Sequence, residues 1–102
     1  MLKAMVFSVA LLIAPLAQAA TLAVTVDDYS FAPDSITIHP GDTVSWQNND
    51  SVPHTATALD GKSFDSGTLD PGARWSFTFK MPGHYPYRCA IHPDMRGTII
   101  VQ

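Results

Sequence analysis

Apolar and polar residues alternate in short runs along most of the chain after residue 20, and Gly, Pro and Asp separate the runs. Alternation of this kind is typical of strands that bury one face. Apolar residues do not recur there at helical spacing over three turns. The pattern predicts about seven to eight short strands, with candidate segments at 22–26, 35–39, 43–48, 55–59, a short extended piece at Phe64, 75–79, 84–88 and 97–101.

Short strands spaced about ten residues apart are typical of a two-sheet β-sandwich, so we predict an all-β fold. All nine acidic residues are Asp, which favours turns over helix interiors. The alternation places Val44, Trp46 and the aromatic residues of segment 75–79 in the core. Pro86 predicts an edge position or a bulge in its strand, because proline cannot donate a ladder hydrogen bond.

The first 19 residues have a different character from the rest of the chain. Lys3 is followed by an apolar stretch over residues 4–14, and Ala17-Gln18-Ala19 supplies small residues before Ala20. This order predicts a signal peptide over 1–19, cleaved after Ala19, and a single domain over 20–102. The apolar stretch is about half the roughly 20 residues that a membrane-spanning helix needs. We therefore expect a periplasmic protein whose mature form has no membrane anchor.

Composition excludes several functional classes. The formal net charge is −3, and the loss of Lys3 with the leader makes it −4. A chain with this net negative charge lacks the excess of Lys and Arg that is typical of a nucleic-acid-binding protein. Its single cysteine, Cys89, excludes an internal disulfide framework and a four-thiolate zinc site.

One group of residues points to metal chemistry. Cys89, His92 and Met95 stand three residues apart between the last two predicted strands. A thiolate, an imidazole and a thioether are soft ligands that favour copper over zinc or hard cations. His54 follows another predicted strand and could complete the set if the two loops meet. Two histidines and one cysteine in a plane, with methionine as a longer axial ligand, make up a type 1 copper site.

Several segments together resemble one family. They are Asn48, Val52-Pro53-His54, Phe64-Asp65-Ser66-Gly67, Pro71-Gly72, Tyr85-Pro86-Tyr87-Arg88-Cys89 and His92-Pro93-Asp94-Met95-Arg96-Gly97. They are similar to the cupredoxins, and most similar to the branch of amicyanin and the small plastocyanin-like proteins.

The resemblance covers the chain from about Thr21 and implies a Greek-key β-sandwich with one copper ion that carries single electrons. It implies the ligands His54, Cys89, His92 and Met95. By the same resemblance, Asn48 corresponds to the asparagine that ties the two ligand loops together.

The same loop predicts how electrons reach a partner. His92 lies beside Pro93 on a chain-reversing loop, so we expect its imidazole edge at the surface as the electron port. Pro53, Ile91 and Pro93 would frame it as a small apolar docking patch for transient redox partners. Asp94 stands where amicyanin has a large apolar residue, which makes the surface beside the copper more polar and acidic. We therefore do not expect the amine dehydrogenase that amicyanin serves to be the partner. We expect a monomer.

Two other functions use the same residues differently. A periplasmic copper-binding or delivery protein would bind the same ion without a role in electron transfer. An oxidase or nitrite reductase would need a second copper site with more histidines, and only His39 and His84 remain, on unrelated turns. We therefore predict an electron carrier that is not an enzyme, with copper delivery as the alternative.

Overall fold

The computed structural model describes residues 18–102, so most of the predicted leader over 1–19 lies outside the described residues. The described part contains eight strands. They are β1 (Thr21–Asp27), β2 (Ser30–Ala32), β3 (Ser35–Ile38), β4 (Thr43–Asn48), β5 (Thr57–Ala58), β6 (Arg74–Thr78), β7 (Gly83–Arg88) and β8 (Arg96–Val101). Within residues 18–102 there is no helix with the length and apolar character needed to cross a membrane.

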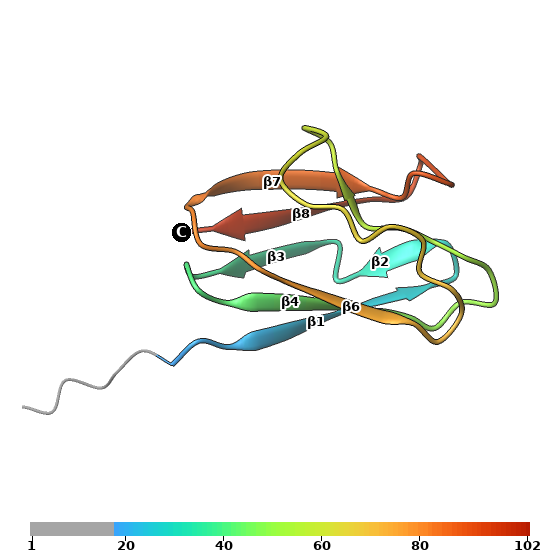
Figure 1. The fold of residues 1–102 in the computed structure, drawn as a ribbon, viewed down its shortest axis with the longest axis horizontal. Coiled ribbons are helices and arrows are strands. Elements are labelled where there is room, and N and C mark those ends of the chain that lie inside the picture. The colour runs from blue at the N-terminus through green and yellow to red at the C-terminus, as the bar shows by residue number, and fades with distance from the viewer. Residues whose placement is uncertain (1–17) are drawn as a thin grey trace, which may run out of the picture.

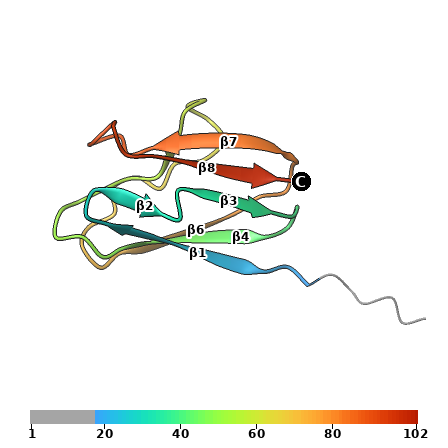
Figure 2. The same cartoon turned by 180° about the vertical axis from the view of Figure 1, so that it is seen from behind.

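The strands form two sheets of four that pack face to face (Figure 1, and from behind in Figure 2). The first sheet has the order β2-β1-β4-β6 and the second has the order β3-β8-β7-β5. Two of the pairings, β1 with β4 and β3 with β8, are parallel, and the others are antiparallel. The prediction of an all-β sandwich is confirmed.

The core lies between the two sheets and is rich in aromatic side chains. Trp46 on β4 is fully buried, and its ring lies 5.5 Å from Phe64 and 5.6 Å from Tyr87, measured between centroids. Tyr87 and Cys89 point inward from the same face, as the alternation of a strand requires. Trp75 and Phe77, expected in the core, are only partly buried and pack against it.

Other differences from the sequence prediction concern short elements. Strand β2 was not predicted, because three residues between a turn and Pro33 carry no periodic signal. Residues 55–59 form only the two-residue strand β5, and Phe64 is buried outside any named strand. Pro86 lies on β7, between β5 and β8, and not on an edge. Proline is tolerated there because β5 pairs only with Tyr87 and Arg88.

The two ends of the sandwich differ in what they carry. The start of β1 and the C-terminus of β8 lie at the left-hand end of Figure 1. The connection between β7 and β8 lies at the opposite end, on the right. The residues that carry candidate chemistry are gathered at this right-hand end.

Candidate metal centre

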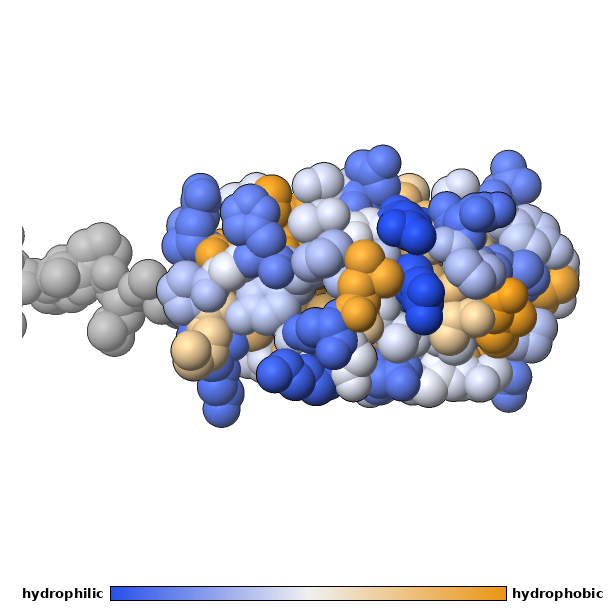
Figure 3. All heavy atoms as spheres, turned by 90° about the horizontal axis from the view of Figure 1, so that it is seen from above, coloured by the Kyte–Doolittle hydropathy of each residue, from blue (hydrophilic) through white to orange (hydrophobic). Residues whose placement is uncertain are grey.

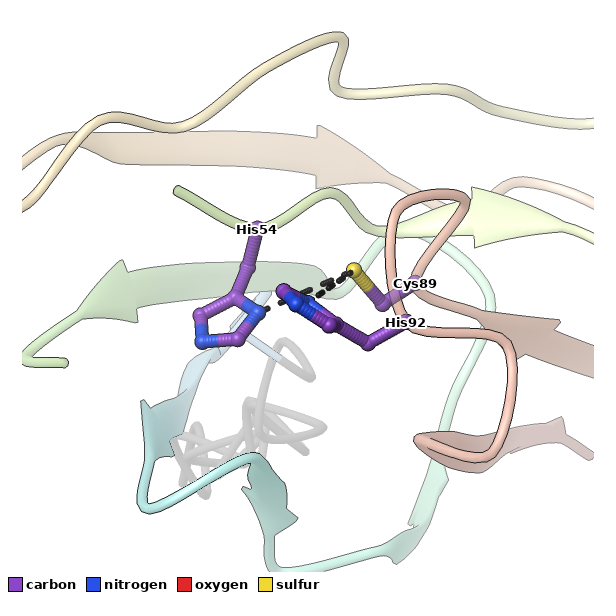
Figure 4. Close-up of side chains that lie close together, drawn as sticks. All are labelled: His54, Cys89 and His92. Atoms are coloured by element: carbon purple, nitrogen blue, oxygen red, sulfur yellow. Dashed lines mark hydrogen bonds between the residues drawn. The ribbon is translucent and has the colours of Figure 1, made fainter. Parts of the chain in front are cut away.

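Two loops bring three donor side chains together. The Cys89 Sγ atom lies 3.7 Å from His54 Nδ1 and 4.0 Å from His92 Nδ1. The donor atoms of these three residues all lie within 4.8 Å of one another. Figure 4 shows His54 reaching the sulfur from the segment before β5, while Cys89 and His92 come from the β7–β8 loop. Residues 35 positions apart therefore meet, as the family resemblance implies.

His54 is held from both its backbone and its ring. Its N–H donates to Leu69 O at 3.1 Å, and it accepts the Leu69 N–H at 2.7 Å. The side chain is fully buried, and Nε2 lies 2.8 Å from Asp50 Oδ2. The hydrogen bond from His54 lowers the pKa of Asp50, followed in effect by those from the Tyr29 and Ser51 backbones. An ionised carboxylate accepts a hydrogen bond from Nε2–H, so Nδ1 is left to face Cys89 as a ligand.

Asn48 secures the His54 loop. Its fully buried side chain donates from Nδ2 to Val52 O at 3.0 Å and to Leu69 O at 2.8 Å. Its Oδ1 accepts the N–H of Asp50 at 2.9 Å. These bonds fold residues 48–54 against Leu69, on the His54 side of the site. The sequence prediction placed the tie between the two ligand loops at Asn48, whereas the hydrogen bonds that cross between them belong to another residue.

Thr55 makes that connection. Its N–H donates to Cys89 Sγ at 3.3 Å, and its Oγ1 accepts the N–H of Ala90 at 2.7 Å. Thr55 is only 6% exposed, and its bond to the sulfur is buried, whereas its bond to the exposed Ala90 is only partly buried. Sequence reasoning missed this role, because a threonine at the start of a predicted strand segment has no spacing that marks it as a bond between loops.

The β7–β8 loop is closed by its own backbone. The N–H of Cys89 donates to Met95 O at 3.1 Å, and the N–H of Met95 donates to His92 O at 3.0 Å. Met95 is 4% exposed and belongs to the core cluster. The three predicted ligands of this loop therefore share one tight turn, with Met95 at its inner end.

The thiol of Cys89 is poised to ionise. Burial by itself raises its pKa, but backbone N–H groups of Thr55, His92 and Ile91 and the imidazole of His54 together outweigh burial. The net result lowers the pKa of Cys89 from 9.0 to about 7. Thiolate is the form of cysteine that binds metals.

The loop also shapes the surface above the donors. His92 is half-buried, Ile91 is 46% exposed, and Pro53 and Pro93 are exposed. Figure 3 shows hydrophobic atoms gathered near the right-hand end of the molecule, among hydrophilic ones. A cavity of about 390 Å³ lies there, and residues 91–95 and Tyr29 line it. Tyr29 was not predicted to belong to the site.

The donor set defines a class of protein. Two imidazoles and a buried thiol with a lowered pKa lie beside a buried thioether-bearing residue, at the end of a β-sandwich. Soft thiolate and thioether ligands combined with imidazole fit copper. The residues present therefore fit a mononuclear copper centre.

Comparison with known proteins places the chain in a family. The profile of the cupredoxin-like domain matches residues 2–101, so the chain belongs to the cupredoxin-like family. It is 29% identical to amicyanin-alpha of Methylorubrum extorquens, over 84% of this chain and 76% of that one. It is 34% identical to plastocyanin of Scenedesmus fuscus, over 71% of this chain and 86% of that one. Against three amicyanins, the matched region spans 50–76% of their length.

Solved structures agree with this assignment. A purple cupredoxin from Nitrosopumilus maritimus superposes with a TM-score of 0.74 at 30% identity, covering 79% of this chain and 99% of that one. A copper-containing nitrite reductase from Thermus scotoductus superposes with a TM-score of 0.75 at 33% identity, covering 80% of this chain but only 22% of the reductase. The likeness to that enzyme is thus confined to a fraction of it. Family and donor set together identify one type 1 copper ion as the cofactor.

Proposed function

We propose that this protein is a periplasmic carrier that moves single electrons between redox partners. The observation that carries the proposal is the convergence of His54 Nδ1, Cys89 Sγ and His92 Nδ1 within 4.8 Å, from two loops of a rigid sandwich. Copper, when bound, supplies a one-electron couple between its +2 and +1 states. His54, Cys89 and His92 would hold it, together with Met95.

Hydrogen bonds from the surrounding residues hold these side chains in place. Asp50 orients the His54 ring, and Thr55 donates to the Cys89 sulfur. Partners of this kind set ligand orientation and tune a metal site. A site already held in place has little to rearrange when the charge of the ion changes, which suits rapid electron exchange.

Electrons would leave through His92, the half-buried histidine of the set. The exposed apolar side chains of Pro53, Ile91 and Pro93 lie on the same loops and would form the docking patch. Weak redox encounters bury little surface, so a small patch is sufficient. Such a carrier acts as a monomer that binds its partners transiently and catalyses no reaction of its own.

An optical experiment tests the metal assignment. The mature protein loaded with Cu(II) should show an intense visible absorption that disappears on reduction and returns on oxidation. Cys89→Ser should abolish that absorption, because it removes the thiolate, while the apo-protein keeps its β-sheet circular dichroism. A visible spectrum unaffected by Cys89→Ser would refute the ligand assignment.

A kinetic experiment distinguishes an electron carrier from a copper-delivery protein. An electron carrier should exchange electrons between its reduced and oxidised forms much faster than it loses Cu(I) to a chelator. Release of copper that outpaces electron self-exchange would favour the delivery protein instead.

The proposed periplasmic location rests on the predicted signal peptide. We infer export with cleavage after Ala19, since residues 1–19 have the order of a signal peptide. Amino-terminal sequencing of the protein recovered from a bacterial periplasmic fraction should begin at Ala20. Recovery of uncleaved chain from the cytoplasm would contradict this inference.

A further inference from the structure

The turn between β1 and β2 has a backbone that its sequence does not favour. Asp28 and Tyr29 have φ angles of +49° and +56°, so both are left-handed. A two-residue hairpin turn with two positive φ angles is of type I′, for which Asp-Gly is a preferred pair. Aspartate tolerates this region, but a bulky residue such as tyrosine is a genuine outlier. Tyr29 therefore occupies the position where glycine would fit best.

The surrounding hydrogen bonds enforce this conformation. Asp28 N–H donates to Asp27 Oδ1 at 2.9 Å, and the Ser30 hydroxyl donates to Asp28 O at 3.2 Å. Tyr29 N–H donates to Asp50 Oδ2 at 3.1 Å, and the same oxygen lies 2.8 Å from His54 Nε2. One carboxylate therefore connects the strained turn with a proposed copper ligand.

The strained turn brings the Tyr29 ring against both imidazole rings of the site. Its centroid lies 4.9 Å from the His92 ring and 5.4 Å from the His54 ring, nearly perpendicular to both. Edge-to-face contacts of this length are favourable between aromatic rings. The Tyr29 side chain is nevertheless 50% exposed, so it is not a core residue. Strain held at such a point indicates a functional role.

We propose that Tyr29 is a positioning residue that caps the two imidazoles of the copper site. His92 is carried by the loop between β7 and β8, and two neighbouring aromatic rings pack against its imidazole. Tyr29 contacts it from one side, and His54, at 5.1 Å between centroids, contacts it from another. The cap keeps His92 facing Cys89 and restricts the approach of water and competing ligands. This inference rests on the proposed function, because it concerns the ligands named there.

Four variants test the cap. Tyr29→Gly removes the ring and gives the turn its preferred residue, and Tyr29→Asn removes the ring with another residue that tolerates positive φ. Tyr29→Phe keeps the ring. Asp28→Gly is the matched control, because it relaxes the same turn without touching the ring.

Two measurements are made on each variant. The first is the rate at which the reduced, copper-loaded protein loses Cu(I) to excess bicinchoninate. The second is NMR of the His92 side chain in the apo-protein, which reports rotation of the imidazole without any metal. We expect Tyr29→Gly and Tyr29→Asn to lose copper at least tenfold faster and to show rotational averaging of His92. Tyr29→Phe and Asp28→Gly should stay within about twofold of the parent.

Several outcomes would overturn the cap. One is a parent-like His92 signal and parent-like copper loss in both ring-less variants. Another is an Asp28→Gly protein that changes as much as Tyr29→Gly, which would assign the effect to turn stability. If the parent failed to bind copper, the proposed function would fail, and the NMR comparison in the apo-protein would still decide the role of Tyr29.

Discussion

The bond between Thr55 and the Cys89 loop can be tested by an isosteric change. Thr55→Val keeps the shape and the β-branch but removes Oγ1, which accepts the Ala90 N–H at 2.7 Å and lies 2.9 Å from Thr57 Oγ1. The backbone bond from Thr55 N–H to the Cys89 sulfur is unaffected, because it does not involve the side chain. The variant therefore isolates one of the two ties between the ligand loops.

The expected loss follows from the unmet donor. Because valine fills the same space, no cavity term is added, and the cost is that of leaving the Ala90 N–H without its partner. Such a group costs about 1–3 kcal/mol when buried. Since Ala90 lies near the surface, water replaces part of the bond, and we expect about 1–2 kcal/mol. For a domain of this size that corresponds to a fall in Tm of about 5–15 °C.

Urea unfolding and thermal denaturation of the apo-protein measure this loss, and amide hydrogen exchange locates it. Exchange at Ala90 should accelerate more than exchange in the middle of β4. Thr37→Val is the control, because Thr37 is exposed on β3 and the same substitution there should change stability by less than about 0.5 kcal/mol. A Thr55→Val protein as stable as Thr37→Val, with unchanged exchange at Ala90, would refute the reasoning.

Two further predictions concern the sandwich itself. Gly97→Ala should destabilise it by about 1–3 kcal/mol in urea unfolding, because the new Cβ would overlap Cζ and Oη of Tyr87, a ring only 1% exposed; a parent-like midpoint would contradict this. Asp42 accepts the N–H groups of Ala20 and His39, each at 2.9 Å, and these bonds hold its pKa below the ordinary 3.8. A carboxylate with a lowered pKa stabilises the fold above its unfolded pKa and loses that effect as pH falls through the folded value. Asp42→Asn should therefore lower Tm at pH 7 but much less near pH 3, and a difference in Tm constant from pH 7 to pH 3 would argue against the assignment.

The sequence predicted the regular parts of the fold because these obey a simple period. Residues 43–48 alternate and form β4 with the same bounds. The grouping of Cys89, His92 and Met95 was also predictable, because soft ligands at close spacing carry a chemical signal, whereas the role of His54 came from the family resemblance. Tyr29 and Thr55 were not predictable in this way. Their roles depend on contacts between segments far apart in the chain, and neither residue has a spacing that distinguishes it from an ordinary turn or strand residue.

The departures from local preference concentrate at the end of the sandwich that carries the donors. The centre of each sheet follows the strand period, whereas Tyr29 takes a conformation suited to glycine at the donor end. Hydrogen bonds hold this end together: Tyr29 with Asp50 and Thr55 with Ala90 connect separate segments, and Asp50 with His54 lies within one loop. The two packed sheets carry the strands from which these loops extend, so the folding energy of the sandwich contributes to the donor geometry. Ligands held by such bonds have little freedom to move when the oxidation state of a bound copper ion changes.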